Sequence, residues 1–319
     1  MPDRPPTRLS RAPSPQRRGP LPRERSRRAA RRRGLARLAV LLASIALALA
    51  VVLALALHHS SHDATAPPPP KVIRILIPEG ETRAQIAQIA SRDGLKGSYL
   101  DASRSSPALT PSSYGAPPGA PSLEGFLFPA TYDMYAGASV ARLVALQLQA
   151  FQEYLPAGAR RAAAAMHLSV YQLLTVASMV EREAKVASDR PKIAAVIYNR
   201  LRAGMPLGID ATVYYAVEQA RGIATYSGEL TEEDLHIDSP YNTRLHTGLP
   251  PTPISNPGVA SIEAAAHPAR VDYLYYVAGA DGCGEQVFSD TAAQFERDVA
   301  AYDAAVQRNG GRPPSCRRR

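Results

Sequence analysis

The sequence predicts a mixed α+β fold that follows a single membrane-spanning helix. Residues 38–57 are apolar and contain no charged side chain. Apolar residues recur at helical spacing through the middle of the chain, most clearly between residues 173 and 184. The short strand-like segments, such as residues 72–77 and 271–278, do not alternate regularly with helices. This pattern favours an α+β domain over a doubly wound parallel sheet.

The positive charge of the chain is concentrated at its N-terminus. The formal net charge is +9, but residues 1–37 contain thirteen arginines against Asp3 and Glu24. That segment therefore carries +11, and residues 38–319 carry −2. The folded part has no basic excess of the kind that nucleic-acid-binding domains use, so no nucleic-acid partner is predicted. With almost no large apolar residues, residues 1–37 are predicted to be a disordered basic tail in the cytoplasm.

Residues 38–57 are predicted to be the transmembrane helix. Twenty helical residues span about 30 Å, which is the hydrocarbon thickness of a bilayer. The apolar region of a cleaved signal peptide is shorter, about 7–15 residues, so a retained anchor is favoured. Because the arginines precede the span, the positive-inside rule places the N-terminus in the cytoplasm and the C-terminal part outside. Residues 58–71 end in prolines and lysine and are predicted to be a Pro-rich spacer.

Residues 72–100 are predicted to form a small βα unit. Val72 to Ile77 alternates as a strand, and Thr82 with Gln85 fits a capping box that starts a short helix. Two interpretations stay open: a unit packed on the main domain, or a separate module. Residues 101–122 are rich in Ser, Pro, Gly and Ala and are predicted to be a flexible linker.

Residues 123–308 are predicted to be the main domain. Its centre is a pair of helices, the first starting at a capping box of Ser169 and Gln172 and the second starting near Pro191. The other predicted elements are strands in 123–135, helices in 140–155 and 157–166, a strand or turn in 207–217, loops in 221–240 and 241–257, a helix in 261–266, a hairpin of 271–278 with 286–289, a helix in 291–307, and a frayed basic tail in 309–319.

Two glutamates, Glu181 and Glu183, lie near the end of the first central helix. Residues two apart are separated by about 200° around a helix, so the two carboxyl groups point to opposite sides of the buried stripe. They cannot act side by side in one site. Charged pairs of this kind usually mark a solvated helix face, which is the alternative to a catalytic role.

The chain has two cysteines, Cys283 and Cys316, and no Cys-x-x-Cys motif or Cys/His cluster. No metal site and no other cofactor is therefore predicted. Outside the cytoplasm the two cysteines could form a disulfide, whereas two free thiols are the alternative, and the sequence leaves both open.

Three blocks in this order resemble the endolytic murein transglycosylase family, also called MltG or YceG-like. They are LEGFLFPATY at 123–132, ASMVEREAKVASDRPKIAAVIYNRLRAGMPLGIDATVYYA at 177–216, and YNTRLHTGLPPTPISNPGVASIEAAAHPARVDYLYYV at 241–277. The resemblance implies a YceG-like catalytic domain over 123–308, preceded by an abbreviated LysM-like module in 72–100. It implies a bacterial membrane-anchored enzyme that cuts MurNAc–GlcNAc bonds within peptidoglycan strands, leaves 1,6-anhydro ends and limits nascent strand length. The implied partners are peptidoglycan strands, the cytoplasmic membrane, and peptidoglycan synthases or division proteins.

The resemblance also implies which residues form the site. One glutamate acts as both acid and base, and in lytic transglycosylases it is followed by Ser or Thr. In that register Glu183 is the acid/base, with Ala184 in place of the hydroxyl residue, and Glu181 is the fallback. The substrate-binding residues carried over by position are Asp210, Tyr241, Asn242, Thr243, Asn199, Arg200 and Glu124.

A different function remains compatible with these residues. The chain could be a non-catalytic, membrane-anchored wall-binding or division scaffold that has kept the same fold. The absence of a hydroxyl residue after Glu183 favours this alternative, whereas retention of Glu183, Asp210 and the Tyr-Asn-Thr segment favours the enzyme. Release of 1,6-anhydro products from peptidoglycan distinguishes the two.

Overall fold

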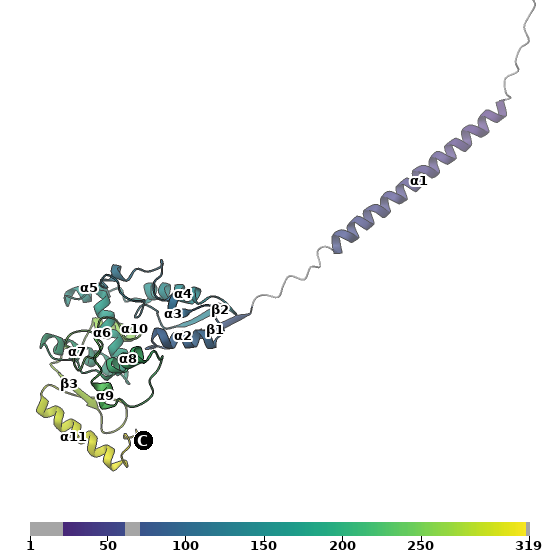
Figure 1. The fold of residues 1–319 in the computed structure, drawn as a ribbon. Helices are drawn as coiled ribbons and strands as arrows, with labels where there is room; N and C mark the ends of the chain where they lie inside the picture. Colours follow the sequence, from purple (N-terminus) through teal and green to yellow (C-terminus); the bar gives the residue numbers. More distant parts are fainter. Residues whose placement is uncertain (1–21, 61–70, 317–319) are drawn as a thin grey trace, which may run out of the picture. The chain divides into compact units, whose positions relative to one another are not determined.

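The computed structural model describes residues 22–60 and 71–316 of the 319-residue chain. The chain divides into two compact units, Met1–Pro69 and Pro70–Arg319, whose elements are labelled in Figure 1. The first unit contains α1 (Pro22–Ser60). The elements of the second unit are β1 (Val72–Leu76), α2 (Arg83–Arg92), α3 (Tyr99–Ala102), η1 (Pro111–Tyr114), β2 (Thr131–Tyr135), α4 (Val140–Tyr154), α5 (Ala159–Ala165), α6 (Val170–Glu183), η2 (Ala187–Asp189), α7 (Arg190–Arg202), α8 (Asp210–Arg221), α9 (Glu232–Leu235), α10 (Val259–Ala266), β3 (Tyr275–Ala278), β4 (Gln286–Ser289) and α11 (Ala292–Arg308).

The first unit is the apolar helix that the sequence predicts. Residues Arg31–His58 of α1 are long and apolar enough to cross a membrane, which is consistent with a single-pass anchor. The helix begins earlier than predicted, because residues 22–37 are helical rather than disordered. Arginine and alanine are good helix formers, and extending an existing helix is easier than starting one. The rest of the predicted tail, residues 1–21, and residues 61–70 of the predicted spacer lie outside the described residues.

The second unit contains a mixture of helices and two separate two-stranded antiparallel sheets, so the predicted α+β class is confirmed. β1 pairs with β2, and the predicted capping box of Thr82 and Gln85 starts α2 between them. The strand that completes this βα unit therefore comes from residues that the sequence assigned to the catalytic domain. The likeness of the unit to a LysM module stays a prediction.

The side chain of Asn256 joins the segment formed by β1, α2 and β2 to the helical part of the second compact unit. Its side-chain oxygen accepts hydrogen bonds from the N–H groups of Gly125 at 2.8 Å and Leu127 at 2.9 Å. Its side-chain nitrogen donates to the carbonyl of Glu81 at 2.9 Å and to Glu124 at 2.7 Å. Asn256 is fully buried, and its four bonds join the segments around residues 81, 124–127 and 256.

Residues 101–122 are packed, which corrects their prediction as a flexible linker. The segment contains the end of α3 and the short helix η1, and Leu109 and Ala116 are buried. The ring of Tyr114 lies 5.4 Å from those of both Phe126 and Phe151. Aromatic burial of this size offsets the ordering cost of a segment that looks linker-like by composition.

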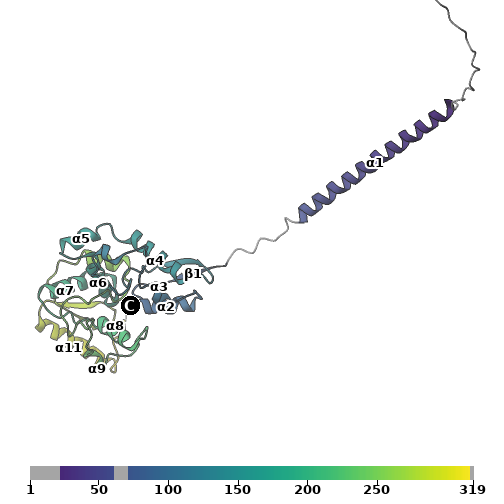
Figure 2. The ribbon, with the colours of Figure 1, turned by 45° about the horizontal axis from the view of Figure 1, so that its top comes forward.

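The core of the second unit is built around α6. Its capping box of Ser169 and Gln172 is present as predicted. Helices α7, α8 and α10 contact it, and α10 makes the most extensive contact. Figure 1 shows α6 among α7, α8 and α10, and Figure 2 shows it beside α7 from a second direction. The fully buried side chains of α6 are Leu173, Leu174, Val176, Ala177, Ser178, Met179 and Val180.

Residues 210–221 form the helix α8, which corrects the predicted strand or turn. The run Thr212, Val213, Tyr214 and Tyr215 favours a strand by local propensity. Val213, Ala216 and Val217 nevertheless bury one helical face against the core, so packing overrides the local preference.

The C-terminal part is a hairpin of β3 and β4 followed by α11, as predicted. Cys283, between the two strands, is bonded to Cys316 beyond α11, so the cysteines form a disulfide rather than two free thiols. This bond also corrects the predicted fraying of the tail, at least as far as Cys316. Asn309, at the end of α11, also donates side-chain hydrogen bonds to the carbonyls of Arg312 and Pro313, and these bonds hold the tail in place.

Candidate active site

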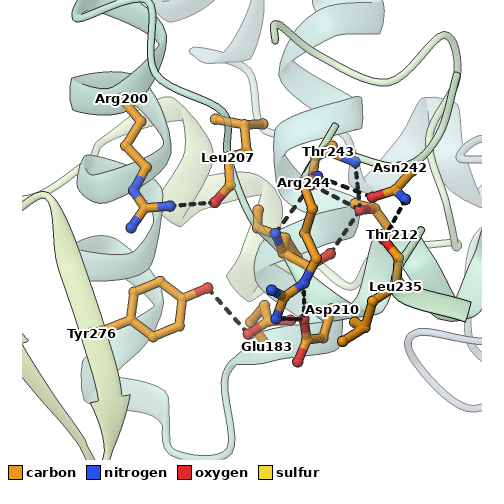
Figure 3. Close-up of polar contacts among 11 residues, drawn as sticks. Glu183, Arg200, Leu207, Asp210, Thr212, Leu235, Asn242, Thr243, Arg244 and Tyr276 are labelled. Carbon is orange, nitrogen blue, oxygen red and sulfur yellow. Dashed lines mark hydrogen bonds and ion pairs between the residues drawn. The ribbon is translucent and has the colours of Figure 1, made fainter. Parts of the chain in front are cut away.

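Glu183 is the last residue of α6 and is partly buried. Its Oε2 accepts a hydrogen bond from the hydroxyl of Tyr276 on β3 at 3.1 Å, as Figure 3 shows. The backbone N–H of Ala211, in the first turn of α8, lies near enough to this carboxyl group to lower its pKa. Glu183 is therefore held at the meeting point of a helix end, a helix start and a strand.

The surroundings of Glu183 raise its pKa. Burial is the largest cause, and the negative charge of Asp210 acts in the same direction. The hydrogen bond from Tyr276, the nearby N–H of Ala211 and the positive charge of Arg182 lower the pKa but do not cancel the effect of burial. A carboxyl group in this position keeps its proton to higher pH than an exposed glutamate, which suits it to act as a general acid.

Asp210 lies directly before Ala211 at the start of α8 and forms an ion pair with Arg244. Nε and Nη2 of Arg244 both donate to the same oxygen, Asp210 Oδ1, at 2.9 and 2.6 Å. The two side chains are 52% and 41% exposed. The structure thus brings Asp210 beside Glu183 as a solvent-accessible carboxylate with its own counter-ion (Figure 3).

Asn242 and Thr243 were predicted to bind sugar, but both are buried and bonded within the protein. Asn242 donates to the carbonyls of Leu235 at 2.9 Å and Ile237 at 3.0 Å. Thr243 Oγ1 accepts from the N–H of Ile209 at 3.0 Å and shares a hydrogen bond with Thr212. These bonds fix the loop at the start of α8, and direct sugar binding by the two residues stays a prediction.

Tyr241 is likewise part of the packing of this loop. Its hydroxyl shares a 3.1 Å hydrogen bond with Thr252, and its ring centre lies 4.9 Å from that of Tyr215. Burial raises the pKa of its hydroxyl. These contacts give Tyr241 a structural role, and substrate binding by it stays a prediction.

Asn199 and Arg200, also predicted to bind substrate, hold the segment that leads into β3. Asn199 donates to the carbonyls of Val271 at 2.9 Å and Tyr273 at 2.8 Å. Arg200 donates to the carbonyl of Leu274 at 2.6 Å and to that of Leu207 at 2.7 Å. Arg200 thereby links the approach to α8 with the strand that carries Tyr276 (Figure 3).

Glu181 points away from Glu183, as the helical spacing predicts. Its Oε2 accepts from the N–H of Gly258 at 2.9 Å, immediately before α10, and its Oε1 lies 3.8 Å from Arg190. Its side chain is 7% exposed. Glu181 therefore stabilises the contact between α6 and α10, and Glu183 is the better acid/base candidate.

Glu124 is a buried carboxyl group at the junction with the βα unit. Both of its oxygens accept from the N–H of Arg83 at 3.1 Å, at the start of α2. Burial raises its pKa to about 7, although the bonds from Arg83 and Asn256 lower it. These bonds tie Glu124 into the packing at this junction, and its predicted contact with substrate stays a prediction.

Tyr276 and Arg244 are the site residues that sequence reasoning missed. Arg244 directly follows the predicted binding segment Tyr-Asn-Thr, and this neighbouring position is the signal in the sequence that could have identified it. Tyr276 is one of four tyrosines or leucines in a row on a predicted strand, and nothing local distinguishes it. Within residues 31–58 and 71–316, no group of three or more His, Cys, Asp or Glu side chains is arranged to hold a metal ion.

Comparisons with known proteins agree on one family. Residues 53–301 match the YceG-like family. A protein of Bacillus subtilis named endolytic murein transglycosylase is 41% identical over 56% of this chain and 48% of its own length. A protein of Streptococcus pneumoniae with the same name is 34% identical over 56% of this chain and 32% of its own length. The chain thus spans about half or less of the length of these curated relatives.

A solved structure of a Listeria monocytogenes protein, described as a putative YceG-like protein, has the same fold. It superposes with a TM-score of 0.59 and 33% identity. The match covers 72% of this chain and 75% of the Listeria chain.

Proposed function

The chain belongs to the YceG-like family, and on this basis we propose that it is a membrane-anchored endolytic transglycosylase of peptidoglycan. It cleaves the MurNAc–GlcNAc β-1,4 bond within glycan strands and leaves 1,6-anhydro-MurNAc ends. The similarity to relatives named endolytic murein transglycosylase, at 41% and 34% identity, supports the reaction class.

The observation that carries this proposal is the environment of Glu183. The first step needs a neutral carboxylic acid that gives its proton to the glycosidic oxygen while the bond from C1 to that oxygen breaks. Burial raises the pKa of Glu183 and so favours the neutral form. Glu181 is tied to Gly258 and Arg190, so Glu183 is the carboxyl group of α6 that is available for this step.

The second step needs the same group as a base. After the first proton transfer Glu183 is a carboxylate, which takes the proton of the C6 hydroxyl while that oxygen attacks C1. The hydroxyl of Tyr276 donates to this carboxylate, and the nearby N–H of Ala211 also favours its charged form. The proton that Glu183 gave is thereby restored, the anhydro ring closes, and no water is consumed.

The proposal places the second unit outside the cytoplasm. The arginines before the apolar helix α1 and the disulfide Cys283–Cys316 both support this orientation. There the enzyme would shorten nascent strands, with peptidoglycan synthases or division proteins as partners. A reporter fused after Arg319 tests the orientation, because it should be active only outside the cytoplasm.

Product analysis tests the reaction itself. The full chain in detergent is incubated with purified sacculi, and the released fragments are analysed by mass spectrometry. We expect internal cleavage with 1,6-anhydro ends. Fragments that end in a free reducing sugar would show hydrolysis instead, and the absence of any cleavage would favour the scaffold.

A further inference from the structure

Arg244 belongs to neither half of this acid–base cycle, yet its guanidinium group is paired with Asp210, whose negative charge acts on Glu183. We propose that Arg244 determines specificity by binding a carboxylate group that the muramyl residue of the substrate carries. This inference rests on the proposed function and adds to it the chemical group by which the site selects its sugar.

The backbone at Arg244 is fixed through its own N–H and through the residue before it. Its N–H donates to the side-chain oxygen of the buried Asn242 at 3.1 Å. The preceding residue, Thr243, is tied to Ile209 at 3.0 Å and to the N–H of Gly208 through its carbonyl at 2.9 Å. Buried polar bonds of this kind fix a loop in one conformation, so the start of the Arg244 side chain has a set position at the N-terminus of α8.

The guanidinium group, in contrast, is held by a single partner. Among the described residues it donates to Asp210 alone, and both bonds go to one carboxylate oxygen. A guanidinium has five N–H donors and matches a carboxylate best with two parallel bonds to two oxygens. Because both side chains of the pair are about half exposed, an incoming carboxylate can take over or share Arg244 without opening the core.

The substrate of the proposed reaction carries such a carboxylate on every second sugar. A muramyl residue has a lactyl group at C3, which is a free carboxylate in bare strands. In peptide-bearing strands that carboxyl group is an amide, and the stem peptide supplies carboxylates instead. The alternating N-acetylglucosamine has neither, so a strand displaced by one sugar would leave Arg244 without its ligand. Arg244 would thereby select the bond that yields an anhydromuramyl end.

Binding at Arg244 also acts on the acid. The charged and hydrogen-bonding groups that act on Glu183 are Asp210, Tyr276, Arg182 and the N–H of Ala211. When Arg244 turns toward the substrate, the negative charge of Asp210 is less compensated. That charge raises the pKa of Glu183, so substrate binding would help to keep the acid protonated for the first step.

The experiment compares two forms of one substrate. Soluble glycan strands are prepared with stem peptides intact, and a second portion is treated with an amidase to leave free lactyl carboxylates. Kinetics are measured for the full chain in detergent, for Arg244→Gln and for Arg244→Lys. Arg142→Gln, which removes an exposed arginine on α4 instead, is the matched control. Melting temperatures are compared to establish that each variant is folded.

We expect Arg244→Gln to raise KM by about 10- to 100-fold, as loss of a hydrogen-bonded charge pair does, with a smaller change in kcat. Arg244→Lys should recover part of the loss, and Arg142→Gln should match the wild type. An effect confined to bare strands identifies the lactyl carboxylate, and one confined to peptide-bearing strands identifies the stem peptide. An unchanged KM on both substrates, or a loss in kcat alone, would overturn the inference. Inactive wild-type protein would instead count against the proposed function.

Discussion

The hydroxyl of Tyr276 and Oε2 of Glu183 lie 3.1 Å apart although 93 residues separate them in the chain. The contact joins the end of α6 to β3, and the carboxyl group cannot keep this donor unless the hairpin is in place. Because Arg200 holds both the segment before β3 and the segment before α8, one side chain aligns two of the three elements that meet at Glu183.

Replacing each α6 glutamate by glutamine should separate the two carboxyl groups by role. Glu183→Gln can neither give nor take the proton, so we expect a loss of activity of about 10²–10⁴-fold or more. Glu181→Gln should keep most activity but lower the melting temperature, because it loses its charge beside Arg190. Anhydro-product release is measured with both variants folded. An inactive Glu181→Gln with an active Glu183→Gln would reverse the assignment.

Tyr276→Phe should move the pH profile of the reaction upward. The acid step needs protonated Glu183, so activity falls as pH rises through the pKa of that group. The Tyr276 hydrogen bond lowers this pKa, and removing it should shift the alkaline limb of kcat/KM to higher pH. One such bond contributes about 0.5–1.5 kcal/mol, so the maximal rate should fall by up to about tenfold. A lower rate with an unmoved limb would mean that Tyr276 does not act through Glu183.

Asp210→Asn should move the same limb in the opposite direction. The negative charge of Asp210 raises the pKa of Glu183. Without it, Glu183 should lose its proton at lower pH, and activity should begin to fall at lower pH. Measuring kcat/KM against pH for the two variants side by side is a strict test, since a general structural disturbance would not shift the limb in opposite directions.

Glu124 should make the stability of the protein depend on pH. Its folded pKa of about 7 lies above its ordinary value of 4.5. The folded state therefore binds this proton more tightly, and the resulting stability is full below pH 4.5 and is lost as pH rises to about 7. Glu124→Gln has no such proton. Its melting temperature, measured from about pH 4 to pH 8, should fall less steeply than that of the wild type. Parallel curves would show that folding does not raise the pKa of Glu124.

Removing the disulfide should affect stability more than catalysis. The bond closes a loop between residues 33 apart, for which loop-closure entropy predicts about 3–4 kcal/mol. Cys283→Ser with Cys316→Ser should therefore melt at a lower temperature, as should the reduced wild type. Activity well below the melting temperature should persist, because neither cysteine contacts Glu183. A folded but inactive variant would show that the bond is needed to position Tyr276.

The sequence correctly predicted the helix starts and side-chain directions, because these depend on residues that are close together in the chain. The capping boxes at Thr82 and Ser169 mark the starts of α2 and α6 because each needs only four adjacent residues. The opposite directions of Glu181 and Glu183 follow from helix geometry alone. Recognition of the family motifs then identified Glu183 and Asp210, which the structure brings together.

The sequence did not predict features that depend on contacts between residues far apart in the chain. Tyr114 looks like part of a linker until Phe126 and Phe151 enclose it. Asn242 and Thr243 suit sugar hydroxyl groups by chemistry, but their partners at Leu235 and Thr212 already use them. No local pattern could show these partners, and none could show that Tyr276 meets Glu183.

The pairing of β1 with β2 has a consequence for anyone who wants to shorten this protein. Deleting residues 72–100 would leave the backbone N–H and C=O groups of β2 without their partners in β1. It would also remove the Arg83 N–H that donates a hydrogen bond to Glu124. The truncated protein would thus expose the unpaired edge of β2, which could pair with another chain. It would also bury the Glu124 carboxyl group without one of its hydrogen-bond donors. A soluble fragment should therefore begin near residue 70. A chimera made between two relatives should exchange all residues beyond that point together.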